Sequence, residues 1–496
     1  MKVRLLISLN TNERIQLADA RNIMFNWMLA HHHHGHIFLR LDDLDDPGDG
    51  QSAEDDPSER GREHLELLDW LGLTWEGDPN APTDEHKPLR LSERLPLYRS
   101  YADRLLESGL AYRCFCSRET LSEMMRKQRI HGRTPHYDGR CLRLSPAEVH
   151  ARLEAGDNYR IRLKTPEVVS EVNDLIRGRL VFDPRSVADL VIMRLDGRPT
   201  PALANVVDDK ELGITYSMRG DRLKDETTRE AFLFHALGLE APTYIHIPLL
   251  LGSDRRLLSA RHGDLYLDEC RKHGYLPDGL INYLAQHGIP PSSDEQLRTL
   301  GALTRAFKVE KINQSPTVWQ EEKLKLFNRL AIEKLSDEQL ARMLVPYVEE
   351  AGYDLLAQGD EWVREFVTAV RPGLNKLADV QDFVDIFLAD GFEPDKKAQE
   401  LLKQPEARLV HEAILDRVEA MDAVDLSNYR EILDEARDRT RARGKALTFV
   451  RLVLTGRQVG PEFSKLLPLL GKERILARLN HARRYIPRAG RGGPRQ

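Results

Sequence analysis

The chain has 496 residues, of which 41% are hydrophobic and 31% are charged, and its formal net charge is −6. A chain of this length can bury several hydrophobic cores, so we expect three or more domains. The sequence has no apolar run long enough to span a membrane and no basic-then-apolar leader, which predicts a cytoplasmic protein. The acidic balance argues against a general nucleic-acid-binding surface, so any contact with RNA must be local.

The first hundred residues alternate between strand-like and helix-like patterns. Residues 3–7 form an apolar run typical of a buried strand, and residues 19–30 follow with helical spacing. Residues 37–41 predict a second strand, and residues 59–71 predict a second helix. This order favours a doubly wound parallel sheet, which we expect to resume around residues 199–219 after an interruption.

The interruption contains three of the four cysteines. Cys114 and Cys116 are one residue apart, and Cys141 follows four residues after Tyr137. This spacing can bring thiolates from two chain segments to a tetrahedral Zn²⁺ ion, with Tyr137 as the fourth ligand. The alternative is a set of buried free thiols, but isolated core cysteines have no reason to cluster while Cys270 stands alone. We therefore predict a structural zinc site.

The C-terminal part of the chain is predicted to be helical almost throughout from about Lys311. Residues 321–335 and 337–351 show amphipathic helical spacing, and Pro372-Gly373 is a plausible joint between two helical domains. Residues 472–496 contain eight Lys or Arg and one Glu. This basic end is either a solvated, flexible tail or a segment that adds contacts to phosphates.

Several motifs resemble those of bacterial glutamyl-tRNA synthetases, in the order and spacing of that family and over nearly the whole chain. One is the cysteine stretch, in which Cys-x-Cys is followed about twenty residues later by Tyr-Asp-Gly-Arg-Cys. The others include Phe25-Asn26-Trp27, Arg40-Leu41-Asp42-Asp43-Leu44-Asp45, Ser92-Glu93-Arg94-Leu95, Asn205-Val206-Val207-Asp208-Asp209, Arg219-Gly220-Asp221, Arg261-His262-Gly263 and Thr455-Gly456-Arg457. On these motifs the chain is identified as a member of that family.

The resemblance implies an α/β N-terminal half, with a Rossmann-like parallel sheet and a zinc-bearing insertion, followed by an all-α C-terminal half. It divides the chain into seven segments. These are a first catalytic half (1–98), an acceptor-end insertion with the zinc knuckle (99–189), a second catalytic half (190–248), a stem-contact region (249–310), two helical anticodon-binding domains (311–372 and 373–482) and a basic flexible tail (483–496).

In this family, glutamate and ATP give glutamyl-adenylate and pyrophosphate, and the acyl group then passes to the 3′ end of tRNA. The resemblance therefore implies ATP with Mg²⁺, glutamate and tRNA(Glu) as partners, structural Zn²⁺ as a cofactor, and a monomer that does not bind membranes. No side-chain nucleophile is needed, because catalysis consists of positioning the substrates and stabilising the negative charge at the α-phosphorus.

The first phosphate-binding motif of the family, at the start of the first helix, is altered here. Gln16 takes the place of a His, and Ala18 and Asp19 take the places of two Gly residues beside the triphosphate. The Asp19 carboxylate can act as an ordinary N-cap worth about 1 kcal/mol. The same charge would repel a phosphate about 4 Å away by roughly 4 kcal/mol at an effective dielectric of 20, or about a thousandfold in ATP affinity.

The second phosphate-binding motif, a Lys-Leu-Ser-Lys-Arg loop in the family, is altered as well. Leu257 and Ala260 take the places of the two lysines, whereas Ser259 and Arg261 are retained. Arg261 and two arginines just before the loop keep this segment cationic and could compensate. Together the two motifs predict reduced or absent adenylation. The catalytic positions implied by the resemblance are Gln16, Asp19, Ser259 and Arg261.

The implied amino-acid pocket is partly retained. Asp42 would meet the amino group of the substrate, while Asn205 and Arg219 suit a carboxylate, for which an arginine fork is well shaped. A strand arginine of the family falls on Leu6, although Arg4 lies on the same strand face two residues away. Structural pairing among these polar residues is the alternative to substrate binding.

Three functions compete. The first is a glutamate–tRNA ligase with weak or lost activity, and the second is a catalytically silent paralogue that binds tRNA(Glu). The second draws support from residues 315–324 and 449–461, which resemble the anticodon-binding helices of the family. The third is a paralogue that glutamylates a tRNA base. It lacks the helical C-terminal half, so the length of this chain argues against it.

Overall fold

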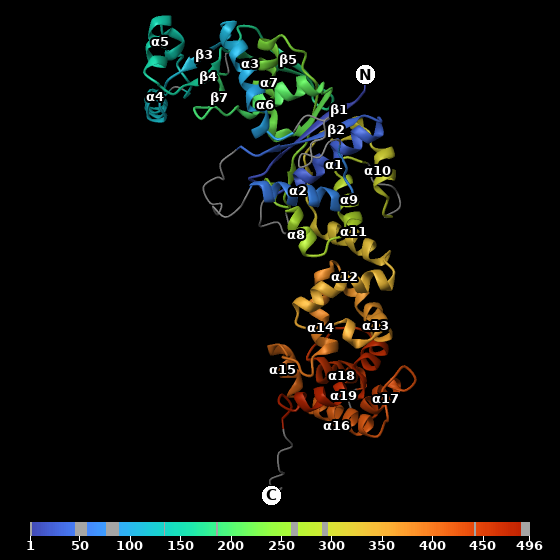
Figure 1. The fold of residues 1–496 in the computed structure, drawn as a ribbon. Coiled ribbons are helices and arrows are strands. Elements are labelled where there is room, and N and C mark those ends of the chain that lie inside the picture. Colours follow the sequence, from blue (N-terminus) through green and yellow to red (C-terminus); the bar gives the residue numbers. More distant parts are fainter. Residues whose placement is uncertain are drawn as a thin grey trace. The chain divides into compact units, whose positions relative to one another are not determined.

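The computed structural model describes residues 2–44, 57–75, 89–132, 134–184, 187–258, 266–289, 296–440 and 443–487. The chain forms two compact units. The N-terminal unit comprises Met1–Lys272 with Pro277–Leu324, and the C-terminal unit comprises His273–Leu276 with Lys325–Gln496. Strands and helices mix in the first unit, whereas the described residues of the second form only helices and turns (Figure 1).

The N-terminal unit begins with a parallel βαβ arrangement. Strand β1 (Arg4–Asn10) pairs with strand β2 (His36–Asp42) along their whole length, so that Asn10 lies opposite Asp42. Helix α1 (Leu17–His32) connects the two strands and packs against both (Figure 1). Apolar side chains such as Phe25 and Met28 are completely buried on this helix. The predicted strand, helix and strand are therefore confirmed.

A four-stranded sheet with the order β6-β5-β9-β8 continues this unit. Its strands are β5 (Ser170–Asp174), β6 (Gly178–Phe182), β8 (Tyr216–Gly220) and β9 (Thr243–Ile247). Strand β9 is parallel to β8 and β5, and only β6 is antiparallel to its neighbour. The N–H of Thr215, just before β8, donates to the carbonyl oxygen of Arg4 at 3.0 Å. The start of β8 therefore lies beside the start of β1.

In the sequence, the residues that form a separate antiparallel sheet lie between the β1–β2 pair and the parallel strands β8 and β9. Its strands are β3 (Ala111–Cys114), β4 (Arg160–Leu163) and β7 (Leu190–Met193), in the order β3-β4-β7. Its helices are α4 (Arg118–Ile130), the short 3-10 helix η2 (Arg140–Arg143) and α5 (Pro146–Glu154). The cysteines of the predicted zinc site lie on β3, on the turn after it and on η2.

The remaining helices cover the sheets of the first unit and build the second. In the N-terminal unit they are α2 (Pro57–Trp70), η1 (Ser92–Arg94), α3 (Leu95–Glu107), α6 (Pro201–Leu212), η4 (Asp221–Leu223), α7 (Lys224–Leu237), α8 (Leu267–Lys272), α9 (Pro277–Ala285) and α10 (Leu300–Ala306). Helix α11 (Glu321–Glu333) spans the boundary between the units, and a short parallel pair joins β10 (Leu250–Leu251) to β11 (Thr317–Val318). The C-terminal unit holds α12 (Asp337–Glu350), α13 (Asp360–Val370), α14 (Gln381–Leu388), α15 (Lys396–Leu402), α16 (Pro405–Glu419), α17 (Tyr429–Arg439), α18 (Ala446–Thr455) and α19 (Phe463–Ala482).

The predicted α/β N-terminal half and helical C-terminal half are confirmed. Helices α11 and α12 lie within a few residues of their predicted ranges, and the predicted joint is a 3-10 turn at Arg371–Gly373. The finer division into seven segments stays a prediction. Every helix in the described part of the chain is too short or too polar to cross a membrane.

One buried carboxylate fixes the centre of the four-stranded sheet. Asp174, at the end of β5, is 2% exposed. It accepts hydrogen bonds from the backbone N–H groups of Ile176 (2.8 Å) and Arg177 (2.6 Å). It also accepts from the N–H (3.0 Å) and Nδ1 (2.6 Å) of His246 on β9. Burial alone would raise the pKa of Asp174, but the hydrogen bonds from His246 and the two amides lower it below its ordinary value.

We predict that Asp174→Asn destabilises the protein by about 3 kcal/mol at pH 7, because the amide leaves the donors of His246 without an acceptor. The measurement is the urea midpoint of the full chain. Because the pKa of Asp174 is depressed on folding, the stabilisation is present above the unfolded pKa of about 3.9 and is lost as the pH falls through the folded pKa. The difference in free energy of unfolding between the wild-type protein and Asp174→Asn should therefore become smaller at acidic pH.

The matched control is Glu171→Gln on the same strand, where the carboxylate pairs with Arg179 at the surface. An exposed ion pair contributes little to stability. The free energy of unfolding obtained from the urea titration should therefore change by no more than about 0.5 kcal/mol. Equal effects of the two substitutions would contradict the role given to Asp174.

Candidate functional site

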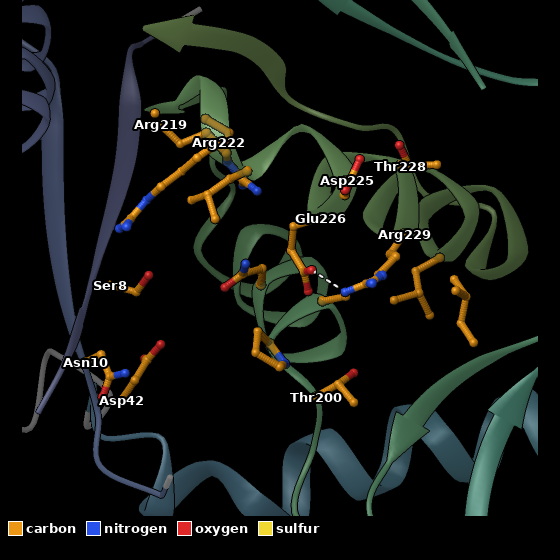
Figure 2. A pocket seen from close by; sticks show the side chains of 18 of the residues that line it. Ser8, Asn10, Asp42, Thr200, Arg219, Arg222, Asp225, Glu226, Thr228 and Arg229 are labelled. Carbon is orange, nitrogen blue, oxygen red and sulfur yellow. Dashed lines mark hydrogen bonds and ion pairs between the residues drawn. The ribbon is translucent and has the colours of Figure 1, made fainter. Parts of the chain in front are cut away.

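A cavity of about 1370 Å³ opens in the N-terminal unit between β1, the start of α1, β8 and α7. Ser8 and Asn10 of β1 and Asp42 at the end of β2 lie on one side, and Thr228 and Arg229 of α7 lie on the other (Figure 2). The strands of an open parallel sheet end at this edge, which is where ligands of such folds bind. The cavity is therefore the candidate site.

The inner wall of the cavity is held by Asp208 of α6, which is completely buried. Its carboxylate accepts hydrogen bonds from Arg40 on β2 (2.7 Å), from Nε of Arg94 (2.8 Å) and from the hydroxyl of Tyr98 (2.8 Å). A buried charge is tolerated only with such partners. The three donors come from β2, η1 and α3, so this carboxylate ties these elements to α6.

The three predicted pocket residues, Asp42, Asn205 and Arg219, all line this cavity. Each is also engaged within the protein. Asp42 accepts two hydrogen bonds from Arg40, at 2.6 and 3.0 Å, and Arg40 also donates to the side-chain Oδ1 atom of Asn205 at 2.9 Å. Arg219 donates to Glu230 at 2.9 Å. In this structure the three residues therefore contact other polar side chains of the protein, as the alternative of structural pairing predicts.

Glu230 of α7 is a member of this network that sequence reasoning missed. It is completely buried and accepts from Asn205 (2.7 Å), from Arg219 (2.9 Å) and from the hydroxyl of Tyr244 (3.0 Å). A glutamate on a helix is usually exposed, so composition gives no reason to select it. The one available signal is the apolar run of residues 231–234 that follows directly.

Arg4 does not supply the positive charge that is missing at Leu6. Leu6 lines the cavity, whereas Arg4 is absent from the described lining. The Nε of Arg4 donates to the carbonyl oxygen of Leu212 at 2.7 Å, and its guanidinium lies 4.9 Å from the ring centre of Phe38. The carbonyl at the C-terminus of α6 therefore holds Arg4 in a different place.

The alternative interpretation of Asp19 as an ordinary N-cap is wrong. The N-cap residue of α1 is Gln16, whose side chain makes no capping hydrogen bond, and Asp19 is the third residue of the helix. The Asp19 carboxylate instead forms an ion pair with Arg222 at 3.1 Å, across the mouth of the cavity. Burial raises the pKa of Asp19 above its ordinary value, while Arg222 acts in the opposite direction. Asp19 therefore already has a cationic partner.

The second motif is only partly within the described chain, because Ser259 and Arg261 lie outside the described residues. The segment that follows it contacts the first motif. Gln16 forms an antiparallel bridge with Tyr266, and the N–H of Leu267 donates to the carbonyl oxygen of Ile15 at 2.9 Å. Leu257, where the family has a lysine, is 64% exposed. The fold thus brings the residues that follow the second motif to the start of α1.

His64 of α2 is a second residue of the cavity lining that the sequence gave no reason to select. Its side chain is 3% exposed, and Nδ1 has no hydrogen-bond partner among the described residues. Burial, helped by the nearby charge of Arg60, lowers the pKa of His64 to about 4. The imidazole is therefore neutral at pH 7 and adds no positive charge to the cavity.

The predicted zinc residues form one buried cluster in the insertion. The Sγ atoms of Cys114, Cys116 and Cys141 all lie within 4.8 Å of one another, and those of Cys116 and Cys141 are 3.5 Å apart. The hydroxyl of Tyr137 is 3.3 Å from Cys114 Sγ and 3.8 Å from Cys116 Sγ. A tetrahedral ion with Zn–S bonds of about 2.3 Å would place its sulfur ligands about 3.8 Å apart. The cluster fits such an ion.

Hydrogen bonds prepare one thiol of this cluster for a metal. Hydrogen bonds from Cys141 and Tyr137 lower the pKa of Cys114 below its ordinary value, against the effect of burial. Burial raises the pKa of Tyr137, and its hydroxyl accepts a hydrogen bond from the N–H of Cys141 at 3.2 Å. The Cys114 thiol is therefore better prepared to bind a metal than the Tyr137 hydroxyl.

Comparisons with known proteins match both halves of the chain. The family described as class I tRNA synthetases (E and Q), catalytic domain, matches residues 14–326, and an anticodon binding domain matches residues 339–483. A glutamate–tRNA ligase of Alkaliphilus metalliredigens is 32% identical over 484 residues, which cover 95% of this chain and 97% of that protein. A glutamate–tRNA ligase of Desulfitobacterium hafniense is 33% identical over 94% of this chain and 95% of that protein. The chain belongs to the glutamate–tRNA ligase family.

Solved structures of this family share the fold. A glutamate tRNA ligase from Elizabethkingia meningosepticum superposes with a TM-score of 0.77 at 24% identity, covering 97% of this chain and 99% of that one. A glutamate–tRNA synthetase from Elizabethkingia anophelis gives a TM-score of 0.79 at 23% identity, with the same coverage. The family assignment from the sequence motifs is thus confirmed. The matches cover both units of the chain.

Proposed function

We propose that this protein is a tRNA(Glu)-binding member of the glutamate–tRNA ligase family in which formation of glutamyl-adenylate from ATP and glutamate is strongly reduced. The family reaction needs ATP with Mg²⁺, and the α1 end of the cavity is where its phosphates would lie. The observation that carries the proposal is the Asp19 carboxylate in the first turn of α1, a place where helix geometry favours anions.

The roles of the site residues follow from their places. Gln16 and Asp19, with Ser259 and Arg261 of the second motif, would face the phosphates, and the free amides of the first turn of α1 would donate to them. Asp42, Asn205 and Arg219 would hold the amino acid. Exposed Leu257 supports the proposal, since an apolar side chain cannot neutralise a triphosphate.

A silent tRNA-binding paralogue is the second candidate. The Asp19–Arg222 ion pair favours it, because it uses a guanidinium at the mouth of the cavity that could otherwise meet a phosphate. ATP–pyrophosphate exchange in the presence and absence of tRNA(Glu) distinguishes the two candidates. Exchange that requires tRNA supports a weak ligase, and no exchange under either condition supports the paralogue.

We predict that the wild-type protein shows little or no ATP–pyrophosphate exchange. Its rate should lie well below the roughly 1 to 10³ s⁻¹ that is typical of enzymes. Asp19→Asn keeps the side-chain size but removes the charge and releases Arg222, so ATP should bind about tenfold more tightly or better. The double variant Gln16→His with Asp19→Gly should likewise improve ATP binding. It should restore the turnover rate less, because the second motif still lacks its two lysines. Equilibrium binding and exchange rates measure both effects.

Asp225→Asn serves as the control, because Asp225 is an exposed acid that lines the same cavity. It changes the charge of the lining equally but lies outside the first turn of α1, so ATP affinity should change less than about twofold. A wild-type exchange rate in the normal range, or equal effects of the two Asp→Asn variants, would show the proposal wrong.

We also propose that Cys114, Cys116 and Cys141, with Tyr137, hold a structural Zn²⁺ ion. Three sulfur donors and one oxygen donor suit zinc, and a closed set of four protein ligands leaves no open position for catalysis. The ion would join β3, the following turn and η2, which are otherwise linked by a small apolar cluster. Bound metal would thus contribute directly to the stability of the insertion.

We predict about one zinc per chain by elemental analysis of protein purified without chelators. Cys116→Ser should abolish metal retention, and Tyr137→Phe should lower it less, because a phenol is the weaker ligand. Cys270→Ser is the matched control, since Cys270 is also fully buried but lies on α8 away from the cluster. A wild-type protein without metal would instead indicate that Cys114, Cys116 and Cys141 are buried thiols.

The third element of the proposal is specific tRNA binding by the helical half. Backbone phosphates supply most of the affinity for RNA and little of the specificity, whereas unstacked anticodon bases can be read individually. The anticodon binding domain matched at residues 339–483 supports this division of roles. Most of the basic tail, residues 488–496, lies outside the described residues and contains three arginines.

We predict that the full chain binds tRNA(Glu) in preference to an unrelated tRNA. Truncation after Pro487 keeps Tyr485 against Phe392 but removes the last three arginines. It should lower affinity for both tRNAs and flatten the salt dependence by about 0.7 to 0.9 per lost phosphate contact, with the preference unchanged. Replacing the arginines by serine in a chain of full length controls for tail length. No preference in the wild-type protein would contradict the proposal.

A further inference from the structure

Charges do not balance in the polar network that includes the inner wall of the cavity, of which Asp42, Asp209 and Arg219 line the cavity itself. Three guanidinium groups, those of Arg40, Arg94 and Arg219, lie among four carboxylates. The four are Asp42, Asp208, Asp209 and Glu230. Asp42 and Asp208 pair with Arg40, Asp208 also pairs with Arg94, and Glu230 pairs with Arg219. Within the described chain, Asp209 is the carboxylate that has no ion pair in this group.

Asp209 is a buried and incompletely bonded side chain at the cavity. It is 6% exposed, it lines the cavity, and its Oδ2 atom has no hydrogen-bond partner among the described residues. Such a group is costly unless a partner arrives from outside. The charged groups that act on it come from its own helix (Asp208), from β2 (Arg40), from β8 (Arg219) and from α7 (Glu230).

These surroundings keep a proton on Asp209. Burial raises its pKa to about 8, and the nearby Glu230 charge acts in the same direction, while Arg219 opposes both. Glu230 accepts hydrogen bonds from Asn205, Arg219 and Tyr244, whereas Oδ2 of Asp209 has no such partner among the described residues. Asp209 is therefore the group that can change its charge when a ligand enters.

We propose that the inner end of this cavity binds the side-chain ammonium group of a diamino acid, with Asp209 as the carboxylate that receives it. The ammonium supplies the missing positive charge, Asp209 releases its proton to solvent, and Oδ2 gains a donor. The α-ammonium group can then lie near Asp42 on the same cavity wall. The inference rests on the proposed function, because it keeps activation of the amino-acid carboxyl group as the reaction at this site. It assigns to the site a substrate class other than glutamate.

A second carboxylate fits this end of the cavity poorly. Arg219 is already neutralised by Glu230, and Arg40 by Asp42 and Asp208. The described lining as a whole contains eight carboxylates and five guanidinium groups. A glutamate side chain would therefore add a buried negative charge without a free cation, which is unfavourable in a low-dielectric site.

The test is calorimetric titration of the full-length protein, without ATP or tRNA, with five probes. Lysine, ornithine and 2,4-diaminobutyrate carry the second amine at different reach, norleucine lacks it, and glutamate replaces it with a carboxylate. We expect at least one diamino acid to bind about tenfold or more tightly than norleucine and glutamate. Norleucine controls for the α-amino and α-carboxyl groups that all five probes share.

Proton release gives an independent signal. At pH 7 binding of the ammonium should release close to one proton, seen as a binding enthalpy that depends on the ionisation enthalpy of the buffer. Affinity should rise with pH up to about 8, where Asp209 is ionised before binding, and then level off. A ligand held only by the outer part of the cavity would show neither effect.

Two variants separate the role of Asp209 from folding. Asp209→Asn keeps the side-chain size and should abolish both the diamino-acid preference and the proton release. Asp225→Asn removes an exposed carboxylate of the same lining and should leave both unchanged. Circular dichroism and urea midpoints check that both variants fold. Glu230→Gln releases Arg219 and should shift the preference toward glutamate.

The proposal is overturned by any of three results: glutamate binds at least as tightly as every diamino acid, norleucine matches the diamino acids, or none of the probes binds at millimolar concentration. Unchanged preference in Asp209→Asn also overturns it. Because the titrations contain neither ATP nor tRNA, such a result leaves the exchange and tRNA-binding predictions standing. Those predictions can fail while diamino-acid binding holds.

Discussion

The architecture of the cavity depends on the buried carboxylate of Asp208, because three separate elements donate hydrogen bonds to it. A charge in this position must be fully partnered to be tolerated. Its partner Arg40 carries the network on to Asp42 and Asn205, and Asn205 continues it to Glu230. The strand ends, α6 and α7 are thus joined by one continuous polar network, of which Asp42 and Asn205 line the cavity.

This network also sets the electrostatics of the site. A guanidinium that is saturated by internal carboxylates has little attraction left for an anionic ligand, even though it lines the cavity. Arg219 and Arg222 both stand at positions suited to an anion, yet each is paired with an acid of the same chain. Under the proposed function, reduced anion binding at both ends of the cavity has a common cause, which is internal charge pairing.

The two units place different demands on the sequence. The helical unit has to keep a folded shape, and its apolar helices remain consistent with an anticodon binding domain. The catalytic unit has to keep both a fold and a set of charges, and it is the charges that differ. Because fold and charge set are largely independent, a chain can retain the family architecture over nearly its whole length while its site acquires other chemistry.

The sequence was sufficient for the features that depend on local pattern. Apolar runs and helical spacing predicted β1, α1 and β2, and cysteine spacing predicted a cluster that the fold closes from residues up to 27 positions apart. It was also sufficient for the family, because the order of short motifs survives substitution within them.

Side-chain pairing was decided by the tertiary structure. Asp19 was expected at the N-cap but pairs with Arg222, 203 residues away, and Arg4 was a candidate cation for the pocket but is held by the end of α6. Composition gave no reason to select Glu230 or His64, because a charged or polar residue on a helix is ordinarily exposed. Whether such a group is buried, paired or left with an open acceptor depends on what distant segments bring to it. For that reason the missing charge beside Asp209 becomes visible only in the folded chain.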